Sequence, residues 1–231
     1  MISEELKGVI SQMLKPLKNI NLSVVIEGLS NHKIIPFNKE NENDIRLLEF
    51  LKNVAVKTCE KVNKEGIKSE RVNEVGNLIE NFVKESIEEN EYKIKPFAKA
   101  VGYPDIAFYD ELNRINYLEC KTYNIDNIAT TQRSFYISPS EKFKIEEDAH
   151  HFLISFQMEK VGETSIEIKT KKKIEKELIE TKEKKKLVGL YKCIAWKILT
   201  LENLDVNIKY EFNSDNKSLY SEKLVLAEGN I

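Results

Sequence analysis

The spacing of apolar residues changes abruptly near the middle of this 231-residue chain, and that change restricts the fold more than any other feature. Over residues 70–89, apolar side chains recur every three to four positions, while Glu and Lys occupy the remaining positions. This period is typical of an amphipathic helix. From Tyr92 onward the pattern becomes short β-rich runs with two-residue alternation, which is typical of strands. The sequence therefore predicts a helix followed directly by a small sheet.

Three segments after this helix are expected to be strands. They cover residues 92–100, 106–109 and 115–123, and a short polar connection at 110–113 joins the last two. A connection this short suits antiparallel neighbours, because parallel strands need a long crossover between them. We therefore expect a three-stranded antiparallel meander.

The flanking regions are expected to add to one domain that spans residues 1–231. Residues 1–66 read as mostly helical, with one helix over 44–63 that places Ile45, Ala55 and Val62 near one face and ends at Gly66. Residues 67–170 form the expected core, which includes strands over 151–159 and 165–169 separated by a turn at Val161. Residues 171–231 form a basic and helical region: 171–186 is a solvated helix or a mobile arm, 187–199 has helical spacing, and 206–212 reads as a strand.

The charge balance excludes a globally basic nucleic-acid binder, because 36 Lys and Arg face 38 Asp and Glu. The balance is uneven, since eleven lysines and four glutamates lie between Lys169 and Lys197. Near-neutrality therefore does not exclude DNA. The three cysteines contain no CxxC pair, which disfavours a disulfide framework or a thiolate zinc site. Without a long apolar run or a signal peptide pattern, the protein is expected to be soluble and cytoplasmic, as in a prokaryotic cell.

Three charged residues of the predicted meander are expected to meet. Asp105 stands just before the strand 106–109, and Glu119 and Lys121 lie two residues apart on the next strand, so they share one face. Two neighbouring carboxylates stay ionised when a divalent cation binds between them, and an ammonium group suits an anionic transition state. The same Glu-x-Lys spacing recurs elsewhere, but here it lies within an apolar strand, where unused charges are costly. A structural ion pair is the alternative interpretation.

These residues resemble a known signature. Pro104-Asp105 with Glu119-Cys120-Lys121 resembles the motif of the PD-(D/E)xK nuclease superfamily, and Gly76 to Glu80 fits the GxxxE pattern of its preceding helix. The resemblance implies an α/β fold with a restriction-endonuclease-like αβββαβ core, a mixed sheet flanked by helices, with helical N-terminal and mixed C-terminal additions. It also implies that Asp105 and Glu119 bind Mg²⁺, for which Mn²⁺ substitutes, and that Lys121 orients or polarises the attacking water. Glu80 would assist the metal or the water, with Glu74 as its alternate.

The resemblance implies three functional hypotheses. The first is a type II restriction endonuclease that cuts double-stranded DNA at a specific sequence, leaves 5′-phosphate ends, acts as a homodimer on a palindromic site and accompanies a cognate DNA methyltransferase. The second is a Holliday-junction resolvase or DNA-repair nuclease of the same superfamily, which would cut only branched or damaged DNA. The third is a non-catalytic DNA-binding protein on this fold.

Residues outside the motif are candidates for DNA contacts. Gln132 and Arg133 follow the strand that carries Glu119, and these residue types read adenine and guanine edges. Lys171, Lys172 and Lys173 lie in the basic segment and could follow a phosphate backbone, or could be part of a solvated surface. His150 and His151 could touch phosphate or metal, although turn or core histidines are commoner. The sequence contains no GxxxxGK[ST] loop and no GxSxG elbow, which argues against NTP-driven and serine-hydrolase chemistry.

Overall fold

A computed structural model describes residues 3–13, 15, 17–70, 72–97, 102–124, 143–175 and 178–208. The chain divides into two compact units, one of residues 22–204 and one that contains the two ends of the chain. Within the described part of the second unit, α1 (Glu4–Met13) precedes β1 (Leu17–Asn21). β1 pairs antiparallel with β8 (Asp205–Ile208), with Leu17 opposite Ile208. The predicted strand over 206–212 is therefore confirmed in its described part.

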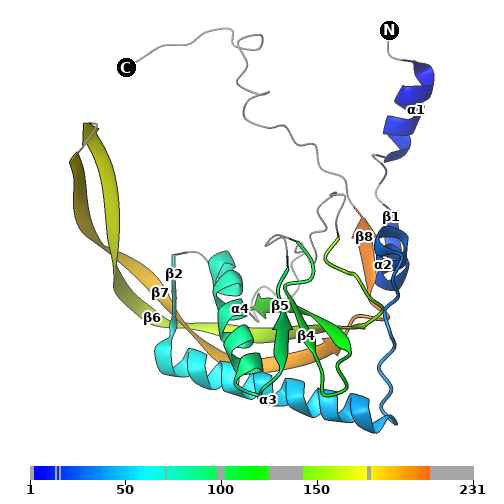
Figure 1. The fold of residues 1–231 in the computed structure, drawn as a ribbon. Helices are drawn as coiled ribbons and strands as arrows, with labels where there is room; N and C mark the ends of the chain where they lie inside the picture. Colours follow the sequence, from blue (N-terminus) through cyan, green and yellow to red (C-terminus); the bar gives the residue numbers. More distant parts are fainter. Residues whose placement is uncertain are drawn as a thin grey trace. The chain divides into compact units, whose positions relative to one another are not determined.

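The unit of residues 22–204 is built on a mixed sheet of six strands in the order β2-β7-β6-β5-β4-β3. Its strands are β2 (Ile67–Ser69), β3 (Lys93–Lys95), β4 (Ile106–Tyr109), β5 (Ile115–Tyr123), β6 (His150–Glu175) and β7 (Leu178–Thr200). Only the β5–β6 pair is parallel. Figure 1 shows β6 and β7 continuing together as a long curved two-stranded ribbon. The predicted mixed α/β architecture is confirmed at this level.

The predicted antiparallel meander is present as β3, β4 and β5. Ile106 lies opposite Leu118, and Tyr109 lies opposite Ile115. Asp110 closes the connection between β4 and β5, because its Oδ1 accepts from the backbone N–H of Arg114 at 2.8 Å. The local turn thus fixes the register that brings Asp105 beside the middle of β5.

Two helices pack on one face of this sheet. These are α3 (Glu42–Glu65) and α4 (Val72–Glu88), and a shorter helix, α2 (Leu22–Ser30), precedes them. The core joins Val75, Ile79 and Val83 of α4 to the even-numbered residues of β5 and β6, among them Leu118, Cys120, Phe152, Ile154 and Phe156. A Cβ on Gly76 would lie 3.4 Å from Thr122 Oγ1, an ordinary van der Waals contact, so this position of α4 faces β5. The helix predicted over 70–89 is therefore confirmed.

The predicted buried face of α3 is partly wrong. Ala55 and Val62 are buried as expected, but Ile45 is 42% exposed. The buried face instead begins at Asp44, which is 3% exposed, and continues through Leu47. The sequence pattern does not identify Asp44 as buried, because Asp44 is charged. Its ion pair with Arg114 makes burial of the carboxylate possible.

The predictions for the C-terminal half contain three errors. The segment 187–199 belongs to strand β7 and is not a helix. The described residues of 171–186 belong to β6 and β7, so the solvated-helix alternative for this segment is wrong. The turn expected at Val161 lies inside the continuous strand β6. The apolar residues of β7 mislead because they occupy both faces of the strand: Val188 is buried, while its neighbour Leu187 is 64% exposed. Short apolar runs of this kind fit both the helical period of about 3.6 residues and the two-residue period of a strand. The helix expected between β5 and β6 falls mainly on residues outside the described part.

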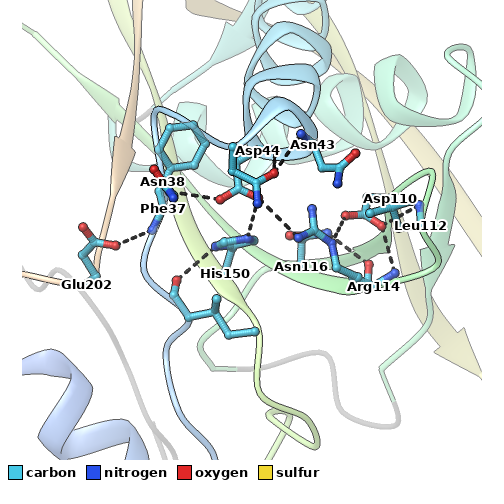
Figure 2. Close-up of polar contacts among 12 residues, drawn as sticks. Phe37, Asn38, Asn43, Asp44, Asp110, Leu112, Arg114, Asn116, His150 and Glu202 are labelled. Atoms are coloured by element: carbon cyan, nitrogen blue, oxygen red, sulfur yellow. Dashed lines mark hydrogen bonds and ion pairs between the residues drawn. The ribbon is translucent and has the colours of Figure 1, made fainter.

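A buried polar cluster joins α3 to the sheet (Figure 2). Asp44 accepts from the backbone N–H of Asn38 at 3.0 Å and lies 3.3 Å from Arg114 Nη1. Arg114 Nε also donates to Asp110 Oδ2 at 2.7 Å. His150 Nδ1 donates to the carbonyl of Ile35 at 3.0 Å, and its Nε2 lies 3.4 Å from Asp44 Oδ1. The cluster thus ties the start of α3, the β4–β5 turn and the start of β6 together.

Among the described residues, no helix has the length and apolar character needed to cross a membrane.

Candidate active site

The β4–β5 hairpin brings Asp105, Glu119 and Lys121 together. Asp105 Oδ2 accepts from the backbone N–H of Cys120 at 2.8 Å, which holds this carboxylate against the middle of β5. Glu119 and Lys121 lie on the same face of β5, and Lys121 Nζ donates to Glu119 Oε1. The convergence therefore depends on the strand pairing and on the two-residue alternation of β5.

Glu119 is deeply buried for a carboxylate, at 3% exposure. Burial, followed by the charge of Asp105, raises the pKa of Glu119 to about 8, although Lys121 acts in the opposite direction. Within the described part of the chain, Glu119 Oε2 has no hydrogen-bond partner. A buried carboxylate oxygen without a partner is costly, because its lost hydration is not compensated.

Glu80 and Glu74 lie on the same helix but differ in their surroundings. Burial and, second, the charge of Asp105 raise the pKa of Glu80, so the carboxyl groups of Glu80 and Asp105 interact electrostatically. Glu74 instead accepts from Ser69 Oγ of β2 at 2.9 Å. The structure therefore associates Glu80 with Asp105, and it places the alternate, Glu74, in a contact with another strand.

The donor set suits a hard divalent cation held by few protein ligands. In the described ranges, no three His, Cys, Asp or Glu side chains are placed to bind one metal ion together. Asp105 and Glu119 supply carboxylate oxygens, and the orphaned Oε2 of Glu119 is the observation that fits a bound cation. Mg²⁺ in proteins is often bound through one or two carboxylates and keeps several waters, so a pair of acids is sufficient.

Lys144 is a residue of this site that the sequence did not indicate. Its Nζ donates to the carbonyls of Gly102 and Pro104, the second at 2.8 Å, and it lies 4.6 Å from the centroid of the Phe97 ring. Burial lowers the pKa of Lys144, while Asp105, Glu119 and Glu80 act to raise it. Lys144 thus anchors the loop that carries Asp105 and adds a positive charge near the acids. One more lysine in a lysine-rich chain gives no signal of this role.

His151 contacts the loop that carries Asp105 through Tyr103. Its Nδ1 and the hydroxyl of Tyr103 are 2.6 Å apart, and its ring lies 4.9 Å from that of Tyr117. His151 is 1% exposed, so it is a core histidine. Burial, followed by the charge of His150, lowers the pKa of His151 to about 3.

This neutral histidine predicts a pH dependence of stability. The unfolded chain binds a proton at His151 near pH 6.5, but the folded chain binds it only near pH 3, so stability is lost as pH falls through this range. Between pH 7 and pH 4 the wild type should lose about 3 kcal/mol more unfolding free energy than His151→Gln, whose amide cannot charge. Urea titrations at the two pH values test the difference. Equal losses in both proteins would contradict it, and His32→Gln, a half-exposed histidine near Asp148, is the control.

Of the remaining candidates, Gln132 and Arg133 fall outside the described residues. Lys171, Lys172 and Lys173 lie in the ribbon half of β6, opposite Thr181, Glu180 and Ile179 of β7. His150 belongs to the buried polar cluster and not to the hairpin site.

Comparison with known proteins identifies the class. The chain is a type II restriction enzyme, a site-specific deoxyribonuclease. Within this class it belongs to the MjaV family, which it matches over residues 16–223. The curated type II restriction enzyme MjaV of Methanocaldococcus jannaschii is 33% identical over 245 aligned residues, which cover 97% of this chain and 95% of that protein. No solved structure shows significant similarity to the chain. The family favours the first functional hypothesis over the resolvase and the non-catalytic protein.

Proposed function

We propose that this restriction endonuclease hydrolyses phosphodiester bonds of double-stranded DNA with Mg²⁺ and leaves 5′-phosphate ends, using Asp105, Glu119 and Lys121. The observation that carries the proposal is the burial of Glu119 beside Asp105, with one carboxylate oxygen lacking a hydrogen-bond partner among the described residues. An apolar strand keeps such a group only at a cost, and cation binding at that oxygen compensates it.

Each residue has a distinct role in this proposal. Asp105 and Glu119 bind the cation, and the Cys120 N–H orients Asp105 for this purpose. A bound divalent cation supplies charge neutralisation at the scissile phosphate. Lys121, whose side chain is 34% exposed, reaches from Glu119 toward solvent and orients the attacking water. Glu80, with its raised pKa, is suited to exchange a proton with that water. Lys144 holds the Asp105 loop in place.

The wider proposal concerns partners and location. A palindromic recognition site would be cut by a homodimer, with one hairpin site for each DNA strand. Gln132 and Arg133 are the proposed base contacts, and Lys171, Lys172 and Lys173 are proposed to contact the phosphate backbone along the ribbon. A cognate methyltransferase would protect host DNA, and both enzymes would act in the cytoplasm, where Mn²⁺ could replace Mg²⁺.

Digestion of a long duplex of known sequence tests the proposal. The purified full chain with Mg²⁺ should produce discrete fragments whose ends map to one recurring sequence, and excess EDTA should abolish cutting. The fragments should be joined by DNA ligase without prior phosphorylation, because their ends carry 5′-phosphates. Cutting that persists in EDTA would contradict the metal role. Cutting restricted to branched or damaged DNA would support the resolvase or repair hypothesis instead.

A further inference from the structure

A row of polar side chains crosses three strands beside the candidate active site. Lys121 of β5 is the register partner of Ser155 in β6, and Ser155 is the register partner of Lys197 in β7. Register partners point to the same face of a sheet. This is the face of Glu119, opposite to the face on which α3 and α4 pack.

The spacing of this row follows from the sheet. Neighbouring strands lie about 4.8 Å apart, so the backbones at Lys121 and Lys197 are separated by about 10 Å. Ser155 lies between them and is 8% exposed, whereas Lys197 is exposed. The row therefore begins at the hairpin acids and leads outward to an accessible cation.

The ammonium group of Lys197 is held near the active-site strand. Its Nζ lies 5.5 Å from the centroid of the Tyr123 ring, and Tyr123 is two residues beyond Lys121 on the same face. The Tyr123 hydroxyl in turn donates to Gln157 Oε1 at 3.5 Å. An aromatic ring that holds a cation in this way reduces the entropy lost when that cation binds an anion.

The two lysines of the row, Lys121 and Lys197, differ in whether a carboxylate balances their positive charge. Lys121 contacts the carboxyl group of Glu119, which balances its charge when Glu119 is ionised. Among the residues that the structure describes, Lys197 has no carboxylate within ion-pair distance. Lys197 is therefore the member of the row with an unbalanced positive charge beside a group of acids that would repel DNA.

We propose that Lys197 binds a phosphate of the DNA backbone next to the scissile phosphate, with Ser155, Tyr123 and Gln157 completing this phosphate subsite. The inference rests on the proposed function, because the hairpin acids define where the scissile phosphate lies. The subsite is contiguous with the active site, and its charge is complementary to DNA and not to a hydrophobic partner. Its role is to fix the backbone position, since phosphate contacts orient a duplex without reading its sequence.

The salt dependence of DNA binding tests the inference directly. The full-length wild type and Lys197→Gln are compared on a short duplex that contains the mapped cleavage site, in Ca²⁺ to permit binding without turnover. Loss of one phosphate contact should reduce the slope of log K against log salt by about 1 and weaken binding roughly tenfold. Lys197→Arg should retain the wild-type slope, because it keeps the charge.

The matched control is Lys52→Gln on α3, a lysine that forms an ion pair with Glu49 at 2.6 Å on the helical side of the sheet. This variant should keep the wild-type slope. If Lys197→Gln also keeps that slope while the wild type cuts DNA, the phosphate subsite is wrong and the proposed function stands. If the wild type neither binds nor cuts duplex DNA with a divalent cation, the proposed function itself fails. Urea midpoints of all variants confirm that each one is folded.

Discussion

Glu119→Gln is expected to lower the rate of DNA cleavage by at least about a thousandfold at saturating DNA. The substitution preserves the shape of the side chain but removes the negative charge that would bind the cation beside Asp105. It also replaces the ion pair between Glu119 and Lys121 by, at most, a hydrogen bond to a neutral amide oxygen. Single-turnover cleavage in Mg²⁺ at pH 8 measures the effect, because at this pH the wild-type carboxylate is substantially ionised.

The control for this variant uses the same sequence spacing outside the site. Glu91 and Lys93 repeat the Glu-x-Lys pattern in exposed positions at the start of β3, so Glu91→Gln should cut at the wild-type rate. Binding of duplex DNA by Glu119→Gln in Ca²⁺ separates a loss of chemistry from a loss of folding. A Glu119→Gln protein that cuts DNA within tenfold of the wild type would rule out the proposed role of this residue.

Asp44→Ala is expected to lower the free energy of unfolding by about 3–5 kcal/mol, the cost typical of removing one partner from a buried ion pair. The substitution leaves Arg114 Nη1 and the backbone N–H of Asn38 without the carboxylate that now accepts from them. His150 Nε2 also loses its neighbour. Three elements meet at this cluster, so the loss should appear in the global unfolding transition measured with urea at pH 7.

Asp148→Ala is the comparison for this stability effect. Asp148 is a surface acid, 54% exposed, that accepts from the backbone N–H of Lys33 at 2.8 Å, and its removal should cost less than about 1 kcal/mol. Asp44→Asn should fall between the two variants, because the amide keeps the shape and one acceptor oxygen. Equal unfolding free energies for Asp44→Ala and Asp148→Ala would show that the cluster does not stabilise the fold.

Local periodicity predicted the parts of the fold whose partners are close in sequence. The helix α4 and the meander β3–β4–β5 have strong periods and short connections, so the sequence alone identifies them. The identity of β7 could not be predicted in this way, because its pairing with β6 joins residues up to about 50 positions apart, as in Phe152 with Thr200. The buried face of α3 was misjudged for a similar reason, since the ion pair that permits burial of Asp44 comes from Arg114, which is 70 positions away.

The same distinction applies to the candidate site. Asp105, Glu119 and Lys121 lie on one hairpin, so the alternation of side chains along β5 was sufficient to predict that they meet. Lys144 and His151 reach the loop at Gly102–Pro104 from distant segments, and Lys197 reaches the site only through the register of two further strands. No local pattern in the sequence records those contacts.

The buried carboxylate of Glu119 has a consequence for how this enzyme evolves. In the metal-free protein, a neutral side chain at this position would relieve the cost of burying charge, so natural variation that improves folding alone should remove the acid. The retention of glutamate would then measure how strongly DNA cutting is selected. Copies of the gene released from that selection should lose Glu119 early and become more resistant to heat as they lose activity.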